Sequence, residues 1–277
     1  MILNYLDDNK YECLKLEQDD NVNIQAKIGD DILQIECLQL NYQQKYEKLQ
    51  QIFKNNNYKF IVPIKYLLSK NMDCGYFLSI TDSFEGTLKD LITKKLSQKN
   101  IVQIIIQLLL GMNELNTMHI FHSDIKPFNI LFNNESDCYH VKIGHFQLSL
   151  FYNENGYLDE WTGGTRKYIA PEILKEELFL DNKSDIYSLG IVFIELIFGR
   201  FLSLNECAFL RKGNFNISQL SPNLEIRDFN EIDKFLIEEV IKKMICQQQP
   251  QRLSSDELLK IIFEFFQSNQ LLSQLQI

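Results

Sequence analysis

The hydrophobic pattern of the chain changes once, near residues 81–86, and this change limits the possible folds more than any other feature. Before it, polar and apolar residues alternate between turn signals, which is the pattern of half-buried strands. The alternating segments are 11–18, 21–28, 32–40, 58–68 and 75–81. After it, apolar residues recur at helical spacing in the segments 88–95, 101–118, 184–198, 232–246 and 255–266. A sheet-based part followed by a helical part is therefore predicted.

One helix is predicted within the sheet-based part. The apolar side chains of Tyr42, Tyr46, Leu49 and Phe53 recur at helical spacing and give an amphipathic helix of about three turns. The pattern as a whole indicates an α+β fold. A small antiparallel sheet with this helix occupies residues 1–80, a larger and mainly helical part occupies residues 81–277, and the hinge lies at about 81–86.

Composition narrows the partners and the compartment. The formal net charge of -9 and the pI near 5.1 provide no basic stripe, so we expect neither nucleic acid nor a membrane as a partner. Six cysteines are dispersed without a CxxC pair, which is typical of reduced thiols. The first residues lack the basic flank and apolar run of a signal peptide, and no segment approaches about 18 consecutive apolar residues. We expect a cytoplasmic protein.

The segment 119–131, HIFHSDIKPFNIL, carries an Asp, a Lys two residues later and an Asn five residues after the Asp. It resembles the catalytic loop of protein kinases. The resemblance implies that Asp124 would accept the proton of the substrate hydroxyl, Lys126 would neutralise the transferring phosphate, and Asn129 would hold a magnesium ion. It also implies that Leu131 would contact adenine.

Three later segments match the same family in the family's order, namely GTRKYIAPE at 164–172, DIYSLG at 185–190 and QPQR at 249–252. The resemblance implies a two-lobed protein-kinase-like fold. It also implies an ion pair between Glu172 and Arg252, and a structural role for Asp185 beneath the catalytic loop. His122 and Phe146 match positions that pack in the hydrophobic spine. Lys126 and Thr165 fit the serine/threonine branch.

The magnesium-binding motif of the family, Asp-Phe-Gly, reads His145-Phe146-Gln147 in this chain. Magnesium prefers oxygen ligands, and an uncharged imidazole replaces the carboxylate poorly. A lone histidine is more often a hydrogen-bonded loop residue than a metal ligand. We therefore expect no metal site here, and Gln147 removes the flexible glycine of the motif.

The glycine-rich loop that holds phosphate in the family has no counterpart. Aligning Leu16, Ile24 and Ala26 to its anchors places Ile24 in the adenine pocket. The same alignment puts three other residues, Glu17, Asp19 and Val22, at the glycine positions. Side chains there would keep backbone amides away from phosphate, and the two carboxylates would repel it.

The third strand departs from the family as well. The residues LQIE at 33–36 align with Val-Ala-Ile-Lys, which makes the phosphate-binding lysine Glu36. Because side chains alternate along a strand, Gln34 and Glu36 should face the same side, toward the nucleotide cleft that the resemblance implies. The lysine's helix partner would be Glu47, which would repel Glu36. Ser123 replaces the Arg of His-Arg-Asp, so activation through a phosphorylated segment is not expected.

These departures favour a catalytically impaired pseudokinase that binds a protein partner as an intracellular scaffold or allosteric regulator, an active kinase being one candidate partner. No cofactor is expected in that case. The alternative is a low-activity serine/threonine kinase that transfers the γ-phosphate of ATP with Asp124 as base, and it requires ATP and magnesium. Nucleotide binding without transfer is a third possibility.

Overall fold

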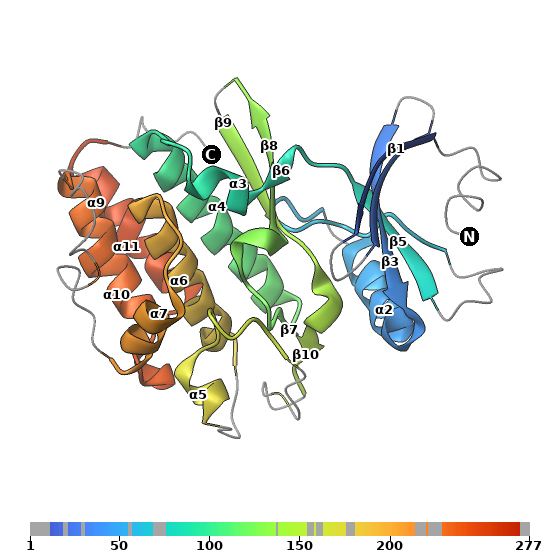
Figure 1. Cartoon of the computed structure of the whole chain (residues 1–277). Coiled ribbons are helices and arrows are strands. Elements are labelled where there is room, and N and C mark those ends of the chain that lie inside the picture. Colours follow the sequence, from blue (N-terminus) through green and yellow to red (C-terminus); the bar gives the residue numbers. More distant parts are fainter. Residues whose placement is uncertain are drawn as a thin grey trace. The chain divides into compact units, whose positions relative to one another are not determined.

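A computed structural model of the 277-residue chain describes residues 12–18, 22–28, 31–54, 57–68, 76–136, 138–153, 158, 163–175, 181–213, 220 and 229–271. The chain forms two compact units, Met1–Glu85 and Gly86–Ile277 (Figure 1). The first is built on an antiparallel sheet and the second is rich in helices, so the predicted α+β organisation in two parts is confirmed.

The sheet of the first unit has five strands in the order β1-β2-β3-β5-β4. Their bounds are Glu12–Gln18 for β1, Val22–Ile28 for β2, Asp31–Gln39 for β3, Tyr66–Leu68 for β4 and Tyr76–Asp82 for β5. All neighbouring pairs are antiparallel. The first three strands match the alternating segments closely, because each is bounded by polar turn residues that favour a reversal of the chain.

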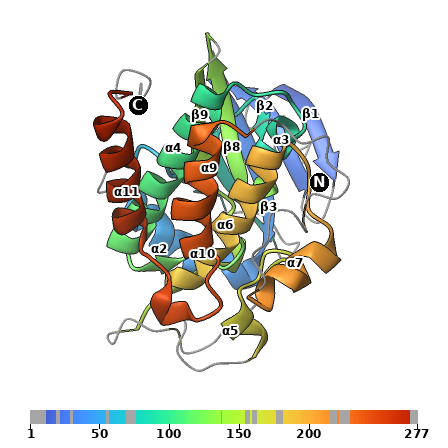
Figure 2. The ribbon, with the colours of Figure 1, turned by 90° about the vertical axis from the view of Figure 1, so that its left-hand side faces the viewer.

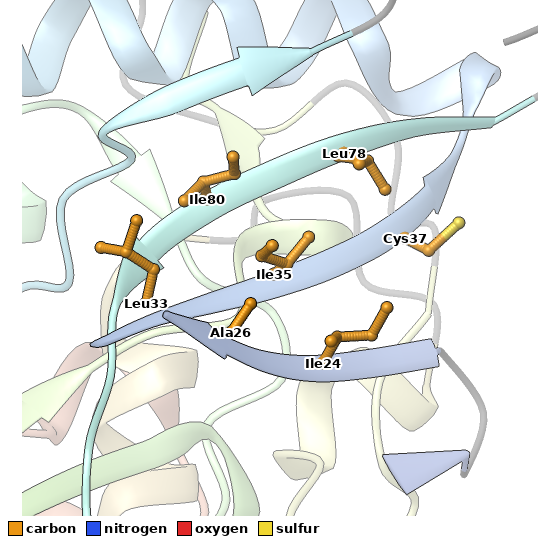
Figure 3. Packing of buried hydrophobic residues seen from close by; sticks show 7 residues of the cluster. All are labelled: Ile24, Ala26, Leu33, Ile35, Cys37, Leu78 and Ile80. Atoms are coloured by element: carbon orange, nitrogen blue, oxygen red, sulfur yellow. The ribbon is translucent and has the colours of Figure 1, made fainter. Parts of the chain in front are cut away.

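The register of the sheet gathers its apolar residues on one face. Ile35 of β3 lies opposite Ile24 of β2 and Ile80 of β5, and all three side chains are fully buried. Directly opposed residues share a face of the sheet, so they belong to one cluster. Figure 3 shows this cluster, which comprises Ile24, Ala26, Leu33, Ile35, Cys37, Leu78 and Ile80.

Helix α2, Gln43–Lys54, follows a short 3-10 helix, η1, Leu40–Tyr42. The predicted residues Tyr46, Leu49 and Phe53 form its buried stripe. The Tyr46 ring meets Phe77 of β5 edge-to-face, with ring centroids 5.5 Å apart. Phe77 lies opposite Leu38, and neither residue belongs to the cluster of Figure 3. Because successive residues of a strand point to opposite faces, α2 packs on the face of the sheet away from that cluster.

One strand was predicted too long. The segment 58–68 forms a strand only at Tyr66–Leu68. Residues 60–64 are largely buried, which explains their apolar pattern, but Pro63 has no amide hydrogen to give to a ladder. The apolar run therefore packs in the core without joining the sheet.

The second unit contains three short strands in one sheet, ordered β6-β8-β9, and a separate pair, β7 and β10. Their bounds are Gly86–Thr87 for β6, Ile120–Phe121 for β7, Ile130–Glu135 for β8, Cys138–Ile143 for β9 and Leu150–Phe151 for β10. The 3-10 turns are η2, Pro127–Asn129, η3, Phe146–Leu148, and η5, Gln249–Gln251. The strands and turns between residues 120 and 151 carry the candidate site.

The helices of this unit are α3, Leu88–Ile92; α4, Gln98–Thr117; α5, Pro171–Leu174; α6, Lys183–Phe198; α7, Leu204–Arg211; α9, Glu231–Phe235; the π-helical η4, Leu236–Ile241; α10, Lys242–Met244; and α11, Ser255–Ser268. Helices α4, α6, α10 and α11 lie side by side in Figure 2, and their packing pairs agree. The segment predicted as one helix at 232–246 is interrupted by η4. Within the described residues, no helix combines the length and apolar character needed to cross a bilayer.

Helix α6 is the central element of this unit, because every residue from Ser184 to Phe198 is buried. Its Gly190 allows α10 to approach closely. A Cβ added at Gly190 would lie 2.7 Å from Cγ2 of Ile245 and 3.0 Å from Cβ of Met244. The position thus requires a residue without a side chain.

Candidate functional site

The backbone of the loop before Asp124 is held by a carboxylate from α6. Asp185, in the first turn of that helix, accepts the amide of His122 at 2.6 Å and the amide of Ser123 at 3.0 Å. Burial raises the pKa of Asp185 to about 7, although the two amide bonds act in the opposite direction. Ser123 has a left-handed backbone, with φ of 70°, and its hydroxyl donates to the carbonyl of Gly163 at 2.6 Å.

Asp124 is surrounded by donors on both carboxylate oxygens. Its Oδ1 accepts the amide of Thr165 at 2.9 Å and the hydroxyl of Thr165 at 2.7 Å. Its Oδ2 accepts Nζ of Lys126 at 2.8 Å and Nδ2 of Asn129 at 2.9 Å. A carboxylate has about four lone-pair sites, so these four bonds use its acceptor capacity. The structure thereby brings together Asp124, Lys126, Asn129 and Thr165.

The charge of Asp124 is stabilised by these bonds. Burial alone would raise the pKa of this carboxyl, but hydrogen bonds from Lys126 and Thr165 outweigh that effect and lower the pKa. The Lys126 ammonium also donates to the Thr165 hydroxyl at 2.9 Å. Asp124 and Lys126 thus form a partly buried, mutually neutralised pair.

Asn129 closes the loop that begins at Asp124. Its amide nitrogen donates both to the Asp124 carbonyl at 2.8 Å and to the Asp124 carboxylate, while its backbone carbonyl accepts the amide of Gly144 at 2.9 Å. These contacts orient the side chain so that only its amide oxygen remains available to a cation. Leu131, two residues later in β8, is half-buried.

His122 is a neutral core residue in this arrangement. Its Nε2 lies 2.8 Å from the Gly144 carbonyl and its Nδ1 accepts the amide of Asp124 at 3.3 Å, so Nε2 carries the hydrogen. Burial lowers the pKa of His122 to about 4. The ring packs against Phe146 with centroids 5.3 Å apart. The contact between His122 and Phe146 that the sequence predicts is therefore present.

His145 is the residue that, by the sequence prediction, replaces the magnesium-binding Asp of the family motif. It has a left-handed backbone, with φ of 62° and ψ of 66°, and Gln147 follows in η3. The residues here fit a magnesium pair poorly, because an imidazole stands beside one amide oxygen and a carboxylate whose acceptor sites are engaged. Within the described ranges, no three His, Cys, Asp or Glu side chains come together as metal ligands.

Glu172 and Arg252, paired on the sequence alone, meet in the interior. The guanidinium makes two bonds to the carboxylate, at 2.5 and 2.6 Å, and the Ser184 hydroxyl donates to the same carboxylate at 2.6 Å. Arg252 also donates to the carbonyl of Cys246 at 2.7 Å. The pair joins α5 to the segment after α10.

The first unit separates two residues that the sequence analysis placed at the nucleotide cleft, Ile24 and Gln34. Ile24 is opposite Ile35 and fully buried in the core cluster, whereas the β2 residue opposite Gln34 is Gln25. Ile24 and Gln34 therefore face opposite sides of the sheet, and the two cannot line one adenine pocket.

Glu36 has a different neighbour from the one expected. It is buried, with 8% of its surface exposed, whereas Glu47 is exposed and accepts Nε2 of Gln43 on its own helix at 2.8 Å. Burial and then the nearby charge of Glu36 raise the pKa of Tyr46. Glu36 is thus close enough to Tyr46 of α2 to act on its charge, whereas Glu47 is exposed and bonded within its own helix.

The glycine-loop positions are only partly described. Glu17 lies in β1, where its backbone is opposite Asn23, and Val22 begins β2 opposite Gln18. Asp19 lies outside the described residues. Glu17 and Val22 thus belong to paired, regular strands.

Sequence reasoning missed a polar contact that positions the β8–β9 hairpin. Gln107 of α4 donates to the carbonyl of Tyr139 at 2.8 Å and accepts the amide of Val141 at 2.9 Å. The side chain of Gln107 thus makes hydrogen bonds that a neighbouring strand would otherwise make along this edge of β9. A Gln within the strongly apolar stretch of 101–118 was the available signal.

Comparisons with known proteins agree with this geometry. The sequence profile described as Protein kinase domain matches residues 32–263. Serine/threonine-protein kinase KIC1 of Saccharomyces cerevisiae is 29% identical over 200 residues, which are 72% of this chain and 18% of that protein. Serine/threonine-protein kinase 17A of Oryctolagus cuniculus is 30% identical over 166 residues, which are 59% of this chain and 40% of that protein. The chain thus spans less than half the length of these relatives.

A solved structure gives the same picture at the level of the fold. A chain from the crystal structure of the yeast RNA Pol II CTD kinase CTDK-1 complex superposes with a TM-score of 0.66, covering 91% of this chain and 92% of that one at 17% identity. At that identity the likeness concerns the fold alone.

Proposed function

The chain belongs to the protein kinase domain family, and from that premise we propose that it is a protein-binding module that does not transfer phosphate from magnesium ATP. The observation that carries the proposal is His145, an imidazole at the position where the family motif supplies a carboxylate to magnesium. Phosphoryl transfer depends on metal ions and cationic side chains to offset the charge that develops on the phosphate.

The first unit supports the same proposal. Glu36 brings a buried carboxylate to the third-strand position that carries lysine in the family. A carboxylate there repels a triphosphate instead of attracting it, at roughly 1 to 4 kcal/mol per contact at about 4 Å. Each 1.36 kcal/mol of lost transition-state stabilisation lowers a rate about tenfold, so combined losses leave little transfer.

The proposed partner is another protein, with an active kinase as one candidate, and the proposed compartment is the cytoplasm. The described cysteines Cys37, Cys138, Cys207 and Cys246 form no disulfide, which supports a reducing compartment. The intact ion pair of Glu172 and Arg252 and the tethered loop support a stably folded module.

A thermal-shift titration with ATP and magnesium tests the proposal. A site with a Kd of about 1 mM would add about 1.4 kcal/mol of stability at about 10 mM ligand. We expect no saturable shift with ATP and magnesium beyond that caused by magnesium with tripolyphosphate. A saturable shift specific to ATP would contradict the proposal.

One alternative function has an observation in its favour. Asp124, Lys126, Asn129 and Thr165 lie together, and the lowered pKa of Asp124 keeps this carboxyl ionised, as a general base requires. The alternative is a low-activity serine/threonine kinase that uses ATP and magnesium. Radiolabelled phosphate transfer that is abolished by Asp124→Ala and retained by the matched surface variant Asp256→Ala would establish it.

A further inference from the structure

The segment that follows Thr165 is anchored by a buried ion pair. Nζ of Lys167 lies 2.5 Å from Oε1 of Glu195, a residue of α6 with no exposed surface. The same carboxylate accepts the hydroxyl of Tyr168 at 3.0 Å and the amide of Leu202 at 2.9 Å. The charge of the Glu195 carboxylate is thus neutralised by Lys167, a residue of the segment itself.

The side chain of Arg211, at the end of α7, binds backbone carbonyls of the same segment. Its Nη1 donates to the carbonyls of Arg166 at 3.1 Å, Lys167 at 3.2 Å and Ile169 at 3.4 Å. Carbonyl acceptors carry no net charge, so these bonds fix the guanidinium without cancelling its charge.

Two further cations stand on the surface beside it. Arg166 and Lys212 are both exposed, and neither has a carboxylate partner among the described residues. We refer to Arg166, Arg211 and Lys212 as the basic patch. The patch lies next to the loop of Asp124, because Arg166 directly follows Thr165, which donates to that carboxylate.

Among the residues that the structure describes, the charged side chains of this region do not balance. Counting Arg166, Lys167, Arg211 and Lys212 against Glu195 gives four positive charges and one negative charge, an excess of three. The nearby pair of Arg200 and Glu206 cancels internally. Burial raises the pKa of the Cys207 thiol to about 12, so this thiol adds no negative charge. This local excess contrasts with the net charge of -9 for the chain.

We propose that the basic patch binds a carboxylate-rich peptide segment of a partner protein. The proposal deepens the proposed function and rests on it, since it names the chemistry of the partner that the module would take. Arginine forks match carboxylates in two-point contacts, and a cluster of cations of one sign favours an anionic partner and speeds its association. Arg211 is already held in place by the carbonyls, which lowers the entropy lost when a carboxylate binds.

Fluorescence anisotropy with three labelled peptides of equal length tests this. One peptide alternates Glu with Ala, the second has Gln at every Glu position, and the third has Lys. We expect the Glu peptide to bind at least about tenfold more tightly than the Gln peptide, the Lys peptide not to bind, and the affinity to fall as salt increases. Equal affinity for the Glu and Gln peptides would overturn the proposal.

Charge-reversal variants locate the site. Arg166→Glu with Lys212→Glu should weaken binding of the Glu peptide by at least about tenfold, because both residues are exposed and the change replaces two cations with two anions. The matched control carries Lys243→Glu with Lys260→Glu, which makes the same change of net charge on η4–α10 and α11. Equal loss in the control would show that net charge rather than the patch is responsible, and would overturn the proposal.

The peptide-binding experiment and the ATP titration test the two proposals independently. Failure of the Glu peptide to bind leaves the absence of an ATP shift unaffected, and an ATP shift leaves the peptide affinities unaffected. Thermal melting of each variant checks that it is folded before its affinity is compared.

Discussion

The guanidinium of Arg252 and the carboxylate of Glu172 form a two-point ion pair that is almost completely buried, with 0% and 2% of their side chains exposed. Such a pair is weak evidence of net stabilisation over an apolar pair, but leaving one partner alone in the interior is costly.

Arg252→Met should therefore lower the free energy of unfolding by about 3 to 5 kcal/mol, measured by urea denaturation. The double variant Arg252→Met with Glu172→Leu should recover part of the loss, since no unpaired charge remains. A single variant within about 0.5 kcal/mol of the parent would show that the pair has no such role.

The pH dependence of stability should report His122. The folded pKa of about 4 lies below the ordinary value of 6.5, so between those values the unfolded chain binds a proton that the folded chain does not. The contribution of His122 to stability should therefore fall as the pH falls through this window, whereas Asp185, with its pKa raised to about 7, contributes in the opposite direction. The expected contribution of His122 is about 2 kcal/mol between pH 7 and pH 5.

The measurement is urea denaturation of the parent and of His122→Phe at both pH values, with His140→Gln as a control because His140 is exposed. His122→Phe should show a smaller difference between pH 7 and pH 5 than the parent does, whatever its absolute stability. An unchanged difference would mean that other groups cause the pH dependence.

Two buried tyrosines should respond oppositely to loss of the hydroxyl. The hydroxyl of Tyr46 has no hydrogen-bond partner among the described residues, whereas that of Tyr168 donates to Glu195 at 3.0 Å. Tyr46→Phe should leave stability unchanged or raise it by about 1 kcal/mol, while Tyr168→Phe should lower it by about 1.5 to 3 kcal/mol. Thermal melting of both variants side by side checks the contrast, and equal losses would contradict it.

Gln107 should control the order of the β8–β9 hairpin. Gln107→Leu leaves the carbonyl of Tyr139 and the amide of Val141 without their partner, which costs about 1 to 3 kcal/mol for each buried group. Hydrogen exchange at the Val141 amide should accelerate.

Gln107→Glu is the matched variant, because it keeps an acceptor for the Val141 amide and loses only the donor to the Tyr139 carbonyl. Exchange at Val141 should remain closer to the parent in Gln107→Glu than in Gln107→Leu. If both variants exchange at the parental rate, the contact does not hold the hairpin.

The fold could be predicted largely from the sequence, because its elements depend on local patterns. The alternation in β1, β2 and β3 and the spacing of Tyr46, Leu49 and Phe53 each fix which face is buried. The prediction of a strand before Tyr66 was wrong because burial and strand pairing are separate properties. An apolar run that contains a proline can be buried without pairing as a strand.

The contacts of the candidate site likewise fall into those that local spacing predicts and those that it does not. Asp124, Lys126 and Asn129 come from one short loop, so their proximity follows from local spacing. The proximity of Glu36 to Tyr46 and the face of Ile24 depend on the register between strands and on the rotation of α2, which local spacing does not fix. The pairing of Lys167 with Glu195 joins residues 28 positions apart and has no periodic signal.

Asp185 holds the loop before Asp124 by the amides of two successive residues, and amides are common to almost every amino acid. The course of that loop is therefore set by a residue of α6 as much as by the loop's own sequence. A single substitution at Asp185 would release two successive amides at once, so the integrity of the loop is inherited from the helix beneath it.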